Sequence, residues 1–192
     1  MIEFLLSLDL KLFLAIHLGG QNELFDFLAP LFRNKVFWAP LYLFILSMVW
    51  FNARPYFWYI VLGGVSLVAV TDTVSSKVIK PAVERVRPCN DQSVQLHIRP
   101  IVDCGSGYSF TSSHATNHFG LACFFVGVLG IIQRRFLWVW WVWASAISLS
   151  QVYVGVHYPG DIIGGALMGL LLGFLWVRGY QRFTKLLKVD KE

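Results

Sequence analysis

The stretch SQVYVGVHYPGD, residues 150–161, joins two long apolar segments and is therefore expected to lie at a membrane surface. It ends with His157 four residues before Asp161, with Pro159 and Gly160 between them. Pro159 suits the first turn of a helix, because the N–H that proline lacks would have no partner there. Asp161 is then within reach of His157, and a carboxylate there can orient an imidazole and stabilise its cation. The pair is a candidate nucleophile with its partner, or else a plain turn whose histidine faces lipid head groups.

The composition indicates a membrane protein. Of the 192 residues, 56% are hydrophobic and the mean hydropathy is +0.59, whereas average globular chains have about 45–50% apolar residues. A spanning helix needs roughly 20 mostly apolar residues. The segments that meet or approach this length are 36–51, 56–71, 114–133, 136–156 and 161–177. We therefore predict an all-α fold, an integral membrane helical bundle of five to six spans in one domain, 1–192.

Residues 1–34 are amphipathic rather than spanning. Asp9 and Lys11 interrupt an apolar run, and Gly19 and Gly20 then end it. We expect one or two helices lying in the membrane interface; a sixth, poorly formed span is the alternative. No cleavable signal peptide is expected, because the first residues lack a basic start.

The distribution of Lys and Arg predicts the orientation, because these residues are retained on the cytoplasmic side. The basic residues of the C-terminal tail are Arg178, Arg182, Lys185, Lys188 and Lys191. With that tail in the cytoplasm, Arg54 and 134–135 also lie inside, whereas 150–161 and the loop 80–111 lie outside. We expect a protein of the cell (inner) membrane with its site on the extracytoplasmic side. The net charge of +5 fits a basic inner rim and an anionic ligand, and no nucleic-acid motif is present.

The second apolar segment leads into a basic loop. Lys80, Arg85 and Arg87 are either a phosphate cradle, with arginine as a planar fork and lysine as a point charge, or a solvated loop near anionic head groups. Asp72 precedes them; an acid at such depth usually points into the bundle. It is a candidate for supporting the site, or an interfacial residue.

Two of the three cysteines, Cys89 and Cys104, lie in the polar loop, whereas Cys123 lies in an apolar segment. If the loop is extracytoplasmic, a Cys89–Cys104 disulfide is expected, because oxidising compartments preserve such bonds. Two separate thiols are the alternative. No metal or other cofactor is expected, because the sequence has neither paired C-x-x-C motifs nor clustered histidines.

The segment FTSSHATN, residues 110–117, opens the third long apolar segment. Ser112 is predicted to cap the helix, and the following backbone N–H groups form an anion site. His114, in the first turn, could donate a proton to a leaving oxygen, or could be only an interfacial histidine. His118 lies one turn further on and is expected to face the same cavity; His17 and His97 receive no role.

Three separated motifs together resemble the type 2 phosphatidic acid phosphatase family of membrane lipid phosphatases. Its first motif, lysine, six residues and Arg-Pro, is similar to KPAVERVRP at 80–88. Its second, Pro-Ser-Gly-His, is replaced by TSSH at 111–114. Its third, Ser-Arg, five residues, histidine, three residues and aspartate, is similar to 150–161. The resemblance covers about 72–173.

The resemblance implies a two-step reaction without a metal. His157 would attack phosphorus and form a phosphohistidine, Asp161 would orient it, and His114 would protonate the leaving oxygen. Such transfer depends on positioning and charge stabilisation. The groups that would hold the phosphoryl oxygens are Lys80, Arg87, Ser112 and the backbone amides of Ser113 and His114.

Gln151 departs from the family pattern, because it stands where the third motif has a phosphate-binding arginine. A charge-assisted hydrogen bond is worth roughly 1.5–3 kcal/mol and a neutral one about half as much. We expect weaker phosphate binding and slower turnover, unless Arg85 or another cation compensates. Thr111 for proline and Ser113 for glycine are milder changes.

The predicted function is that of a membrane lipid phosphatase acting on a lipid phosphate in the bilayer. The candidate substrates are a polyprenyl diphosphate, placed first, a phosphatidylglycerol phosphate or phosphatidate, and a lipid A-like glycolipid. One alternative is a phosphotransferase of the same family that passes the phosphoryl group to another lipid. The other is a catalytically weak lipid-binding or transport protein, which Gln151 would favour.

Overall fold

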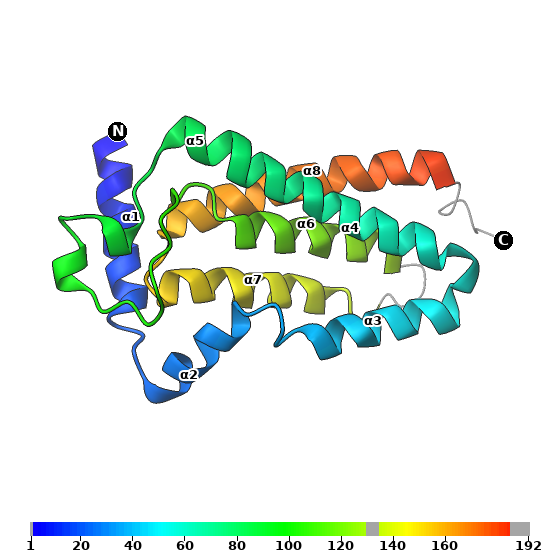
Figure 1. Ribbon diagram of the computed structural model, residues 1–192, viewed down its shortest axis with the longest axis horizontal. Helices are drawn as coiled ribbons and strands as arrows, with labels where there is room; N and C mark the ends of the chain where they lie inside the picture. The colour runs from blue at the N-terminus through cyan, green and yellow to red at the C-terminus, as the bar shows by residue number, and fades with distance from the viewer. Residues whose placement is uncertain (1, 130–134, 185–192) are drawn as a thin grey trace.

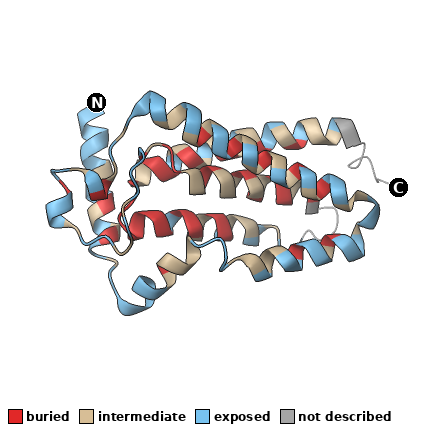
Figure 2. Cartoon of the chain, viewed as in Figure 1, coloured by how far each residue is buried: buried red, intermediate tan, exposed pale blue. Residues whose placement is uncertain are grey.

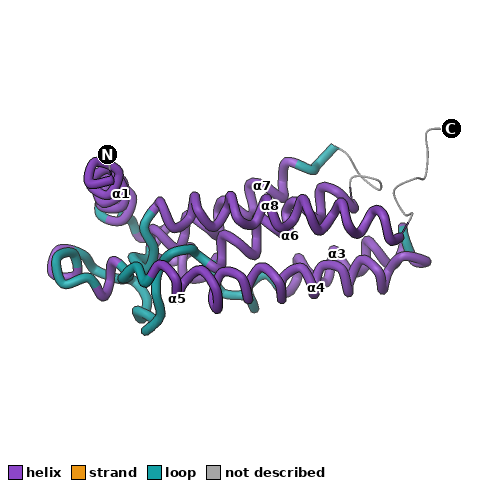
Figure 3. The backbone as a smooth tube through the Cα atoms, turned by 90° about the horizontal axis from the view of Figure 1, so that it is seen from above, coloured by secondary structure: helices purple, strands orange, loops and turns teal. Residues whose placement is uncertain are grey.

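The computed structural model describes residues 2–129 and 135–184. Within these ranges the regular elements are helices, joined by turns and loops, and there is no strand (Figures 1 and 3). The longer helices are α1 (Ile2–His17), α2 (Glu23–Phe32), α3 (Ala39–Asn52), α4 (Phe57–Thr73), α6 (Ser113–Leu129), α7 (Trp138–Tyr153) and α8 (Pro159–Thr184). The shorter ones are the 3₁₀ turns η1 (Arg54–Tyr56), η3 (Pro88–Asn90) and η4 (Gln95–His97), the π-helix η2 (Val74–Ile79) and the single turn α5 (Lys80–Val83).

Helices α3, α4, α6, α7 and α8 run along the long axis of an elongated bundle, and each coincides with one predicted apolar segment (Figure 1). Two continuous helical stretches are long and apolar enough to cross a membrane by length and composition: Arg54–Val83, with 30 residues, and Pro159–Arg182, with 24. The fold is thus that of a helical membrane protein, and the number of spans stays a prediction.

Helices α6 and α8 form the most intimate contact of the bundle, because glycines of α8 face the α6 backbone. A Cβ on Gly169 would collide with the carbonyl oxygen of Thr116, and one on Gly173 would lie 2.8 Å from that of Gly120. Small residues at such positions let helices approach closely in membranes. The close approach sets the N-terminal turns of both helices beside each other, where the backbone N–H of Ser112 donates to the carbonyl oxygen of Asp161 at 3.1 Å.

Helices α3, α4 and α8 have many exposed residues, drawn pale blue in Figure 2, and large apolar side chains are among them. Leu43, Trp58 and Leu167 are examples, each more than half exposed. Soluble monomers rarely expose apolar surface on this scale. A lipid environment accounts for it.

The N-terminal helices close one end of the bundle. Helix α1 lies across the bundle axis, and the long loops gather at the same end (Figures 1 and 3). The buried residues Phe13 and His17 of α1 pack against the α7–α8 region. His17 has a structural role there, because its ring is hydrogen-bonded to the Tyr153 carbonyl oxygen at 2.7 Å and accepts from the Arg99 N–H at 3.3 Å.

Part of the predicted orientation falls outside the described residues. Arg134 and the tail lysines Lys185, Lys188 and Lys191 are among the residues outside those ranges. The assignment of the C-terminus to the cytoplasm therefore stays a prediction.

Candidate active site

The turn between α7 and α8 presents His157. Gly155 has a φ of +90°, a conformation that only glycine adopts without strain. The turn folds back so that the backbone N–H groups of Val156 and His157 both donate to the carbonyl oxygen of Gln151, at 3.2 Å each. The histidine is thus held on a tight, buried turn rather than on an exposed loop.

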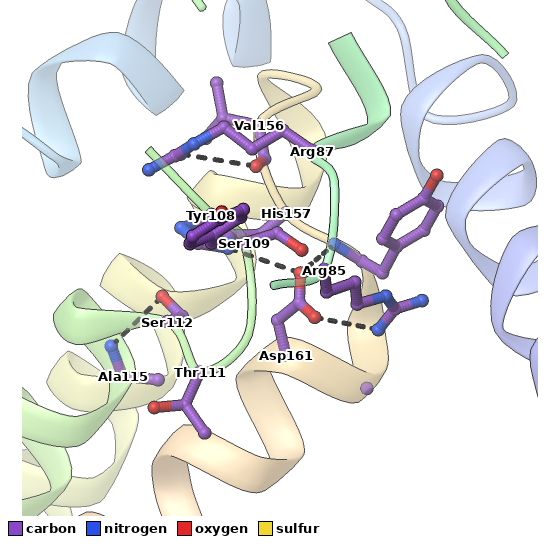
Figure 4. A network of polar contacts seen from close by, with 12 residues as sticks. Arg85, Arg87, Tyr108, Ser109, Thr111, Ser112, Ala115, Val156, His157 and Asp161 are labelled. Atoms are coloured by element: carbon purple, nitrogen blue, oxygen red, sulfur yellow. Dashed lines mark hydrogen bonds and ion pairs between the residues drawn. The ribbon is translucent and has the colours of Figure 1, made fainter. Parts of the chain in front are cut away.

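His157 and Asp161 form a buried pair. Nδ1 of His157 lies 3.3 Å from Oδ2 of Asp161, and the two side chains are 3% and 0% exposed (Figure 4). The same Oδ2 accepts the Tyr158 backbone N–H at 2.8 Å. Asp161 lies in the first turn of α8, which begins at Pro159. We assign the single ring proton of neutral His157 to Nδ1, the nitrogen that faces Asp161. This tautomer leaves a free lone pair on Nε2.

Arg85 connects this pair to α1. Its guanidinium donates to Oδ1 of Asp161 at 2.7 Å and to Oδ2 of Asp9 at 2.6 Å, and it stacks on the Tyr158 ring at 4.1 Å. Asp9 also accepts the Gly160 N–H at 2.7 Å. Two carboxylates therefore neutralise Arg85. Sequence analysis missed Asp9 as a site residue; its one signal was a charge inside an apolar helical run.

The first turn of α6 lies on the other side of the pair. Ser112 is the residue before the helix, and its Oγ accepts the Ala115 N–H at 3.4 Å (Figure 4). His114 follows in the first turn, close enough to His157 for a positive charge on either ring to disfavour one on the other. His118 is stacked on His114 with ring centroids 6.1 Å apart and bonds the His114 carbonyl oxygen at 2.8 Å. The two histidines therefore share one face of α6.

The basic side chains Lys80 and Arg87 are held by backbone carbonyls. Lys80 Nζ donates to the Tyr108 oxygen at 2.8 Å, and Arg87 donates to the oxygens of Gly107 at 2.7 Å and Val156 at 3.4 Å. Among the described residues, neither side chain forms an ion pair with a carboxylate. Their positive charge is therefore available to an anion.

A disulfide fixes the loop that carries these cations. Cys89 and Cys104 are bonded, and their Cα atoms are 5.9 Å apart. Asn90 donates to the Gly105 oxygen at 3.1 Å beside the bond. The crosslink holds the segment after Arg87 against the segment before Tyr108.

Burial and neighbouring charges shift the pKa values of the site residues in different directions. Burial lowers the pKa of His157 to about 4, against the opposing effect of Asp161, and the charges of Arg87 and Lys80 lower it further. Burial also acts to lower the pKa of Arg85, but Asp161 and Asp9 more than offset this and raise it. The pKa of Arg87 is lowered by burial and by the charge of Arg33. His157 is thus a neutral imidazole at physiological pH.

Three of the predicted residues lie at the edge of this cluster or outside it. Ser113 Oγ bonds the hydroxyls of Ser75 and Ser76 at 3.0 Å each. Asp72 accepts from the Asn117 amide at 3.2 Å. Gln151 is 1% exposed, and its amide nitrogen lies 3.4 Å from the Ile147 oxygen and the Ser150 hydroxyl. Its amide therefore donates within its own helix.

An apolar cavity of about 610 Å³ lies between α3, α4 and α6 and reaches the His114 side of the site. Its polar lining residues are Lys35, Asp72, Ser113, His114, Asn117 and His118. Within residues 2–129 and 135–184, no group of three His, Cys, Asp or Glu side chains is placed to hold a metal ion.

The helical membrane fold, the buried histidine–aspartate pair and the nearby cations together define a membrane protein with a phosphate-handling site. The chain belongs to the PAP2 superfamily, whose sequence profile matches residues 56–185. It is 34% identical to a protein named lipid A 4'-phosphatase from Bacteroides thetaiotaomicron, over 99% of this chain and 84% of that one.

Solved structures agree with this assignment. The crystal structure of a transmembrane PAP2 type phosphatidylglycerolphosphate phosphatase from Bacillus subtilis has a TM-score of 0.66 and 26% identity, over 97% of this chain and 88% of that one. LpxE of Aquifex aeolicus shares the fold, with a TM-score of 0.68 at 20% identity over 89% of this chain and 95% of that one. The protein is a membrane-embedded lipid phosphatase.

Proposed function

We propose that this phosphatase hydrolyses a phosphate monoester on a lipid A-like glycolipid through a phosphohistidine intermediate, without a metal ion. The observation that carries the mechanism is the buried His157–Asp161 pair, with Nδ1 and Oδ2 3.3 Å apart. Pairs of this kind activate a nucleophile in unrelated enzymes. The substrate class rests on the relative named lipid A 4'-phosphatase, which aligns with nearly the whole chain.

In the first step, Nε2 of His157 forms a bond to phosphorus while the bond from phosphorus to the lipid oxygen breaks. His114 gives its proton to that oxygen as it leaves. Asp161 stabilises the positive imidazole ring through the Nδ1 proton. Lys80, Arg87 and the N–H groups at the start of α6 hold the phosphoryl oxygens, whose charge is greatest in the transition state.

In the second step, water attacks the phosphohistidine. His114, now neutral, takes a proton from that water as the new oxygen–phosphorus bond forms and the nitrogen–phosphorus bond breaks. Inorganic phosphate leaves, and His114 is again protonated. The same residue thus serves as acid and then as base, as microscopic reversibility allows.

The apolar cavity beside His114 suits the lipid part of the substrate. It lies between helices whose outer faces contact lipid, so an acyl chain could stay in apolar surroundings while its head group reaches His157. We place this site on the extracytoplasmic side, as the basic segments predict. The Cys89–Cys104 disulfide supports that placement, because such bonds persist in oxidising compartments.

The sequence analysis places a polyprenyl diphosphate first among the candidate substrates. The relative named lipid A 4'-phosphatase, which aligns with nearly the whole chain, moves a glycolipid monoester ahead of it. The test is phosphate release by detergent-purified protein from lipid A, phosphatidylglycerol phosphate and undecaprenyl diphosphate, each with and without EDTA. We expect release from lipid A, insensitivity to EDTA and loss of activity in His157→Ala. His97→Ala, in the exposed turn η4, is the matched control.

The outcomes separate the alternatives. Preference for undecaprenyl diphosphate or phosphatidylglycerol phosphate would reject the substrate class and keep the mechanism, whereas loss of activity in EDTA would reject the metal-free mechanism. Product formation that requires a second lipid would identify a phosphotransferase. Lipid binding without turnover of any of the three would support a binding or transport protein.

A further inference from the structure

One face of α1 is turned toward the site end of the bundle. Asp9, Phe13 and His17 follow one another at intervals of four residues and therefore lie on one side of the helix. Phe13 and His17 are buried, and the Asp9 side chain is 13% exposed. Leu8 and Leu12 of the same helix are exposed. Helix α1 thus presents a carboxylate to the active site while apolar side chains remain on its outer surface.

Both oxygens of Asp9 bind groups next to the His157–Asp161 pair. Oδ2 accepts from Arg85 at 2.6 Å, and Oδ1 accepts the Gly160 N–H at 2.7 Å. Gly160 belongs to the first turn of α8, where backbone N–H groups have no partner within the helix and a carboxylate is favourable. A Cβ at position 160 would lie 2.8 Å from Oδ2 of Asp9, so the glycine makes this close approach possible.

Other contacts of α1 hold the helix in place independently of Asp9. The Phe13 ring meets the Tyr158 ring edge-on, with centroids 5.4 Å apart. His17 is hydrogen-bonded to the Tyr153 carbonyl oxygen at 2.7 Å. A substitution that removes only the charge of Asp9 is therefore expected to leave α1 docked, and its effect on the site can be separated from an effect on the fold.

Arg85 is divided between two carboxylates. Its Nη1 donates to Oδ1 of Asp161 at 2.7 Å (Figure 4), and its Nη2 donates to Asp9. A guanidinium can also bind both oxygens of a single carboxylate. Asp9 occupies Nη2, so that Oδ2 of Asp161 stays available to Nδ1 of His157, 3.3 Å away. Without Asp9, Arg85 would be free to bind both oxygens of Asp161 and to compete with His157 for Oδ2.

The charges of this cluster also favour the product of the first step. Attack on phosphorus leaves a positive charge on the His157 ring, which nearby negative charge stabilises. Asp9 and Asp161 carry two negative charges against the single positive charge of Arg85. Replacing Asp9 by a neutral residue removes this excess of negative charge, so the positive ring is less stable.

We propose that Asp9 is a positioning residue for His157, which acts by holding Arg85 to one oxygen of Asp161, and that α1 is therefore part of the catalytic assembly. This inference rests on the proposed phosphatase activity. In the described part of the chain, the carboxylate of Asp9 binds Arg85 and the Gly160 N–H, and neither is among the groups assigned to the phosphoryl oxygens. Loss of Asp9 should therefore slow the chemical step and leave substrate binding nearly unchanged.

The test compares Asp9→Asn with Glu3→Gln, which removes a charge from an exposed position in the first turn of the same helix. The values of kcat and KM are measured on the lipid phosphate that the unaltered protein hydrolyses fastest. We expect Asp9→Asn to lower kcat by about 10-fold, the lower end of the effect of one charge-assisted hydrogen bond. Its KM should stay within twofold, and Glu3→Gln should match the unaltered protein.

A second comparison places Asp9→Asn in an Asp161→Asn background. Because Asp9 acts through Asp161, the double variant should match the kcat of Asp161→Asn within twofold. The tautomer of His157 gives a readout without turnover, from nitrogen-15 NMR of histidine-labelled protein in which His157→Ala identifies the signals. We expect the Nδ1-protonated form to dominate in the unaltered protein and the Nε2-protonated form to increase in Asp9→Asn.

Each other outcome is decisive. A kcat of Asp9→Asn within twofold of the unaltered protein would overturn the inference and leave the phosphatase assignment standing. Effects of Asp9→Asn and Asp161→Asn that multiply would also overturn it, because Asp9 would then act elsewhere. A lower kcat with an unchanged His157 tautomer would show a purely structural role. If the unaltered protein releases no phosphate from any lipid, the proposed function fails, and the NMR comparison still tests Asp9.

Discussion

Asp161 is buried, and its two oxygens accept from groups that belong to different parts of the chain. Oδ1 accepts from Arg85 at 2.7 Å, and Oδ2 accepts from the Tyr158 N–H at 2.8 Å while it faces His157 Nδ1 at 3.3 Å. A buried carboxylate needs such donors in place of water. They also fix its direction, and the carboxylate in turn fixes the orientation of the imidazole.

Asp161→Asn should therefore leave the fold in place and remove most of the activity. The amide can present its N–H₂ to Nδ1, which favours the wrong tautomer, and it no longer stabilises the imidazole cation. By analogy with the aspartate of a serine protease triad, we expect kcat to fall by about 10²–10⁴-fold. The rate of phosphate release measures this fall in kcat. Asp103→Asn, a substitution at an exposed loop residue, is the control. Activity within twofold of the unaltered protein would contradict the orienting role.

The pH dependence of the first step should reveal the environment of His157. Its neutral form is the nucleophile, so the rate falls as pH drops through its pKa. Burial places that pKa at about 4 instead of 6.5, with Asp161 opposing and Arg87 and Lys80 reinforcing the shift. We expect phosphoenzyme formation, measured after a rapid alkaline quench, to persist down to about pH 5 and to be half-maximal near pH 4. A midpoint near 6.5 would mean that the ring is solvated.

Sequence analysis identified candidate site residues in two ways: by closeness in the chain, as for His157 and Asp161, and by the family motifs, as for Lys80 and His114. His157 and Asp161 are four residues apart, and local turn chemistry alone placed them in reach of each other. Asp9 escaped notice because its partner is remote: Asp9 and Arg85 are 76 residues apart. Packing of α1 across the end of the bundle brings this charge to Arg85 and Gly160.

At the scale of elements, apolar runs predicted every long helix of the bundle, and the errors lie at the ends. The fourth predicted segment extended to Val156, whereas α7 ends at Tyr153. The apolar character continues, but the left-handed Gly155 turns the chain away. The π-helix Val74–Ile79 before Lys80 was not predicted, because periodicity does not reveal one added residue per turn; such segments are often found at functional sites.

The approach of α6 to α8 yields a prediction for a matched pair of substitutions in one helix. A Cβ on Gly169 would collide with the Thr116 oxygen, whereas one on Gly179 would meet nothing within 4 Å. Gly169→Ala must separate the helices and should lower the free energy of unfolding by about 1–3 kcal/mol, the usual cost of overpacking. Gly179→Ala should be neutral or slightly stabilising. Thermal unfolding in detergent compares the two; equal midpoints would contradict the close packing.

At the scale of the whole molecule, the site and the α3–α4 turn lie at opposite ends of the bundle (Figure 1). The site end carries the disulfide and the cations that we propose bind phosphate, whereas the opposite end carries Arg54, which stacks on Trp50 as an interfacial anchor does. The two ends of the bundle thus differ in the groups that they carry. Two independent arguments, retention of basic residues inside and persistence of a disulfide outside, predict that the same end faces the exterior.

This assignment can be tested with single cysteines and a membrane-impermeant maleimide on intact cells. Cys123 is replaced by alanine, and the Cys89–Cys104 bond is kept. Leu96→Cys, at a residue 84% exposed in the loop of the site end, should be labelled from outside. Asn52→Cys, exposed at the opposite end, should be labelled only after lysis, because the reagent does not cross the bilayer. The reverse pattern would place the site in the cytoplasm. It would also remove the argument from the disulfide, since a reducing compartment does not preserve such bonds.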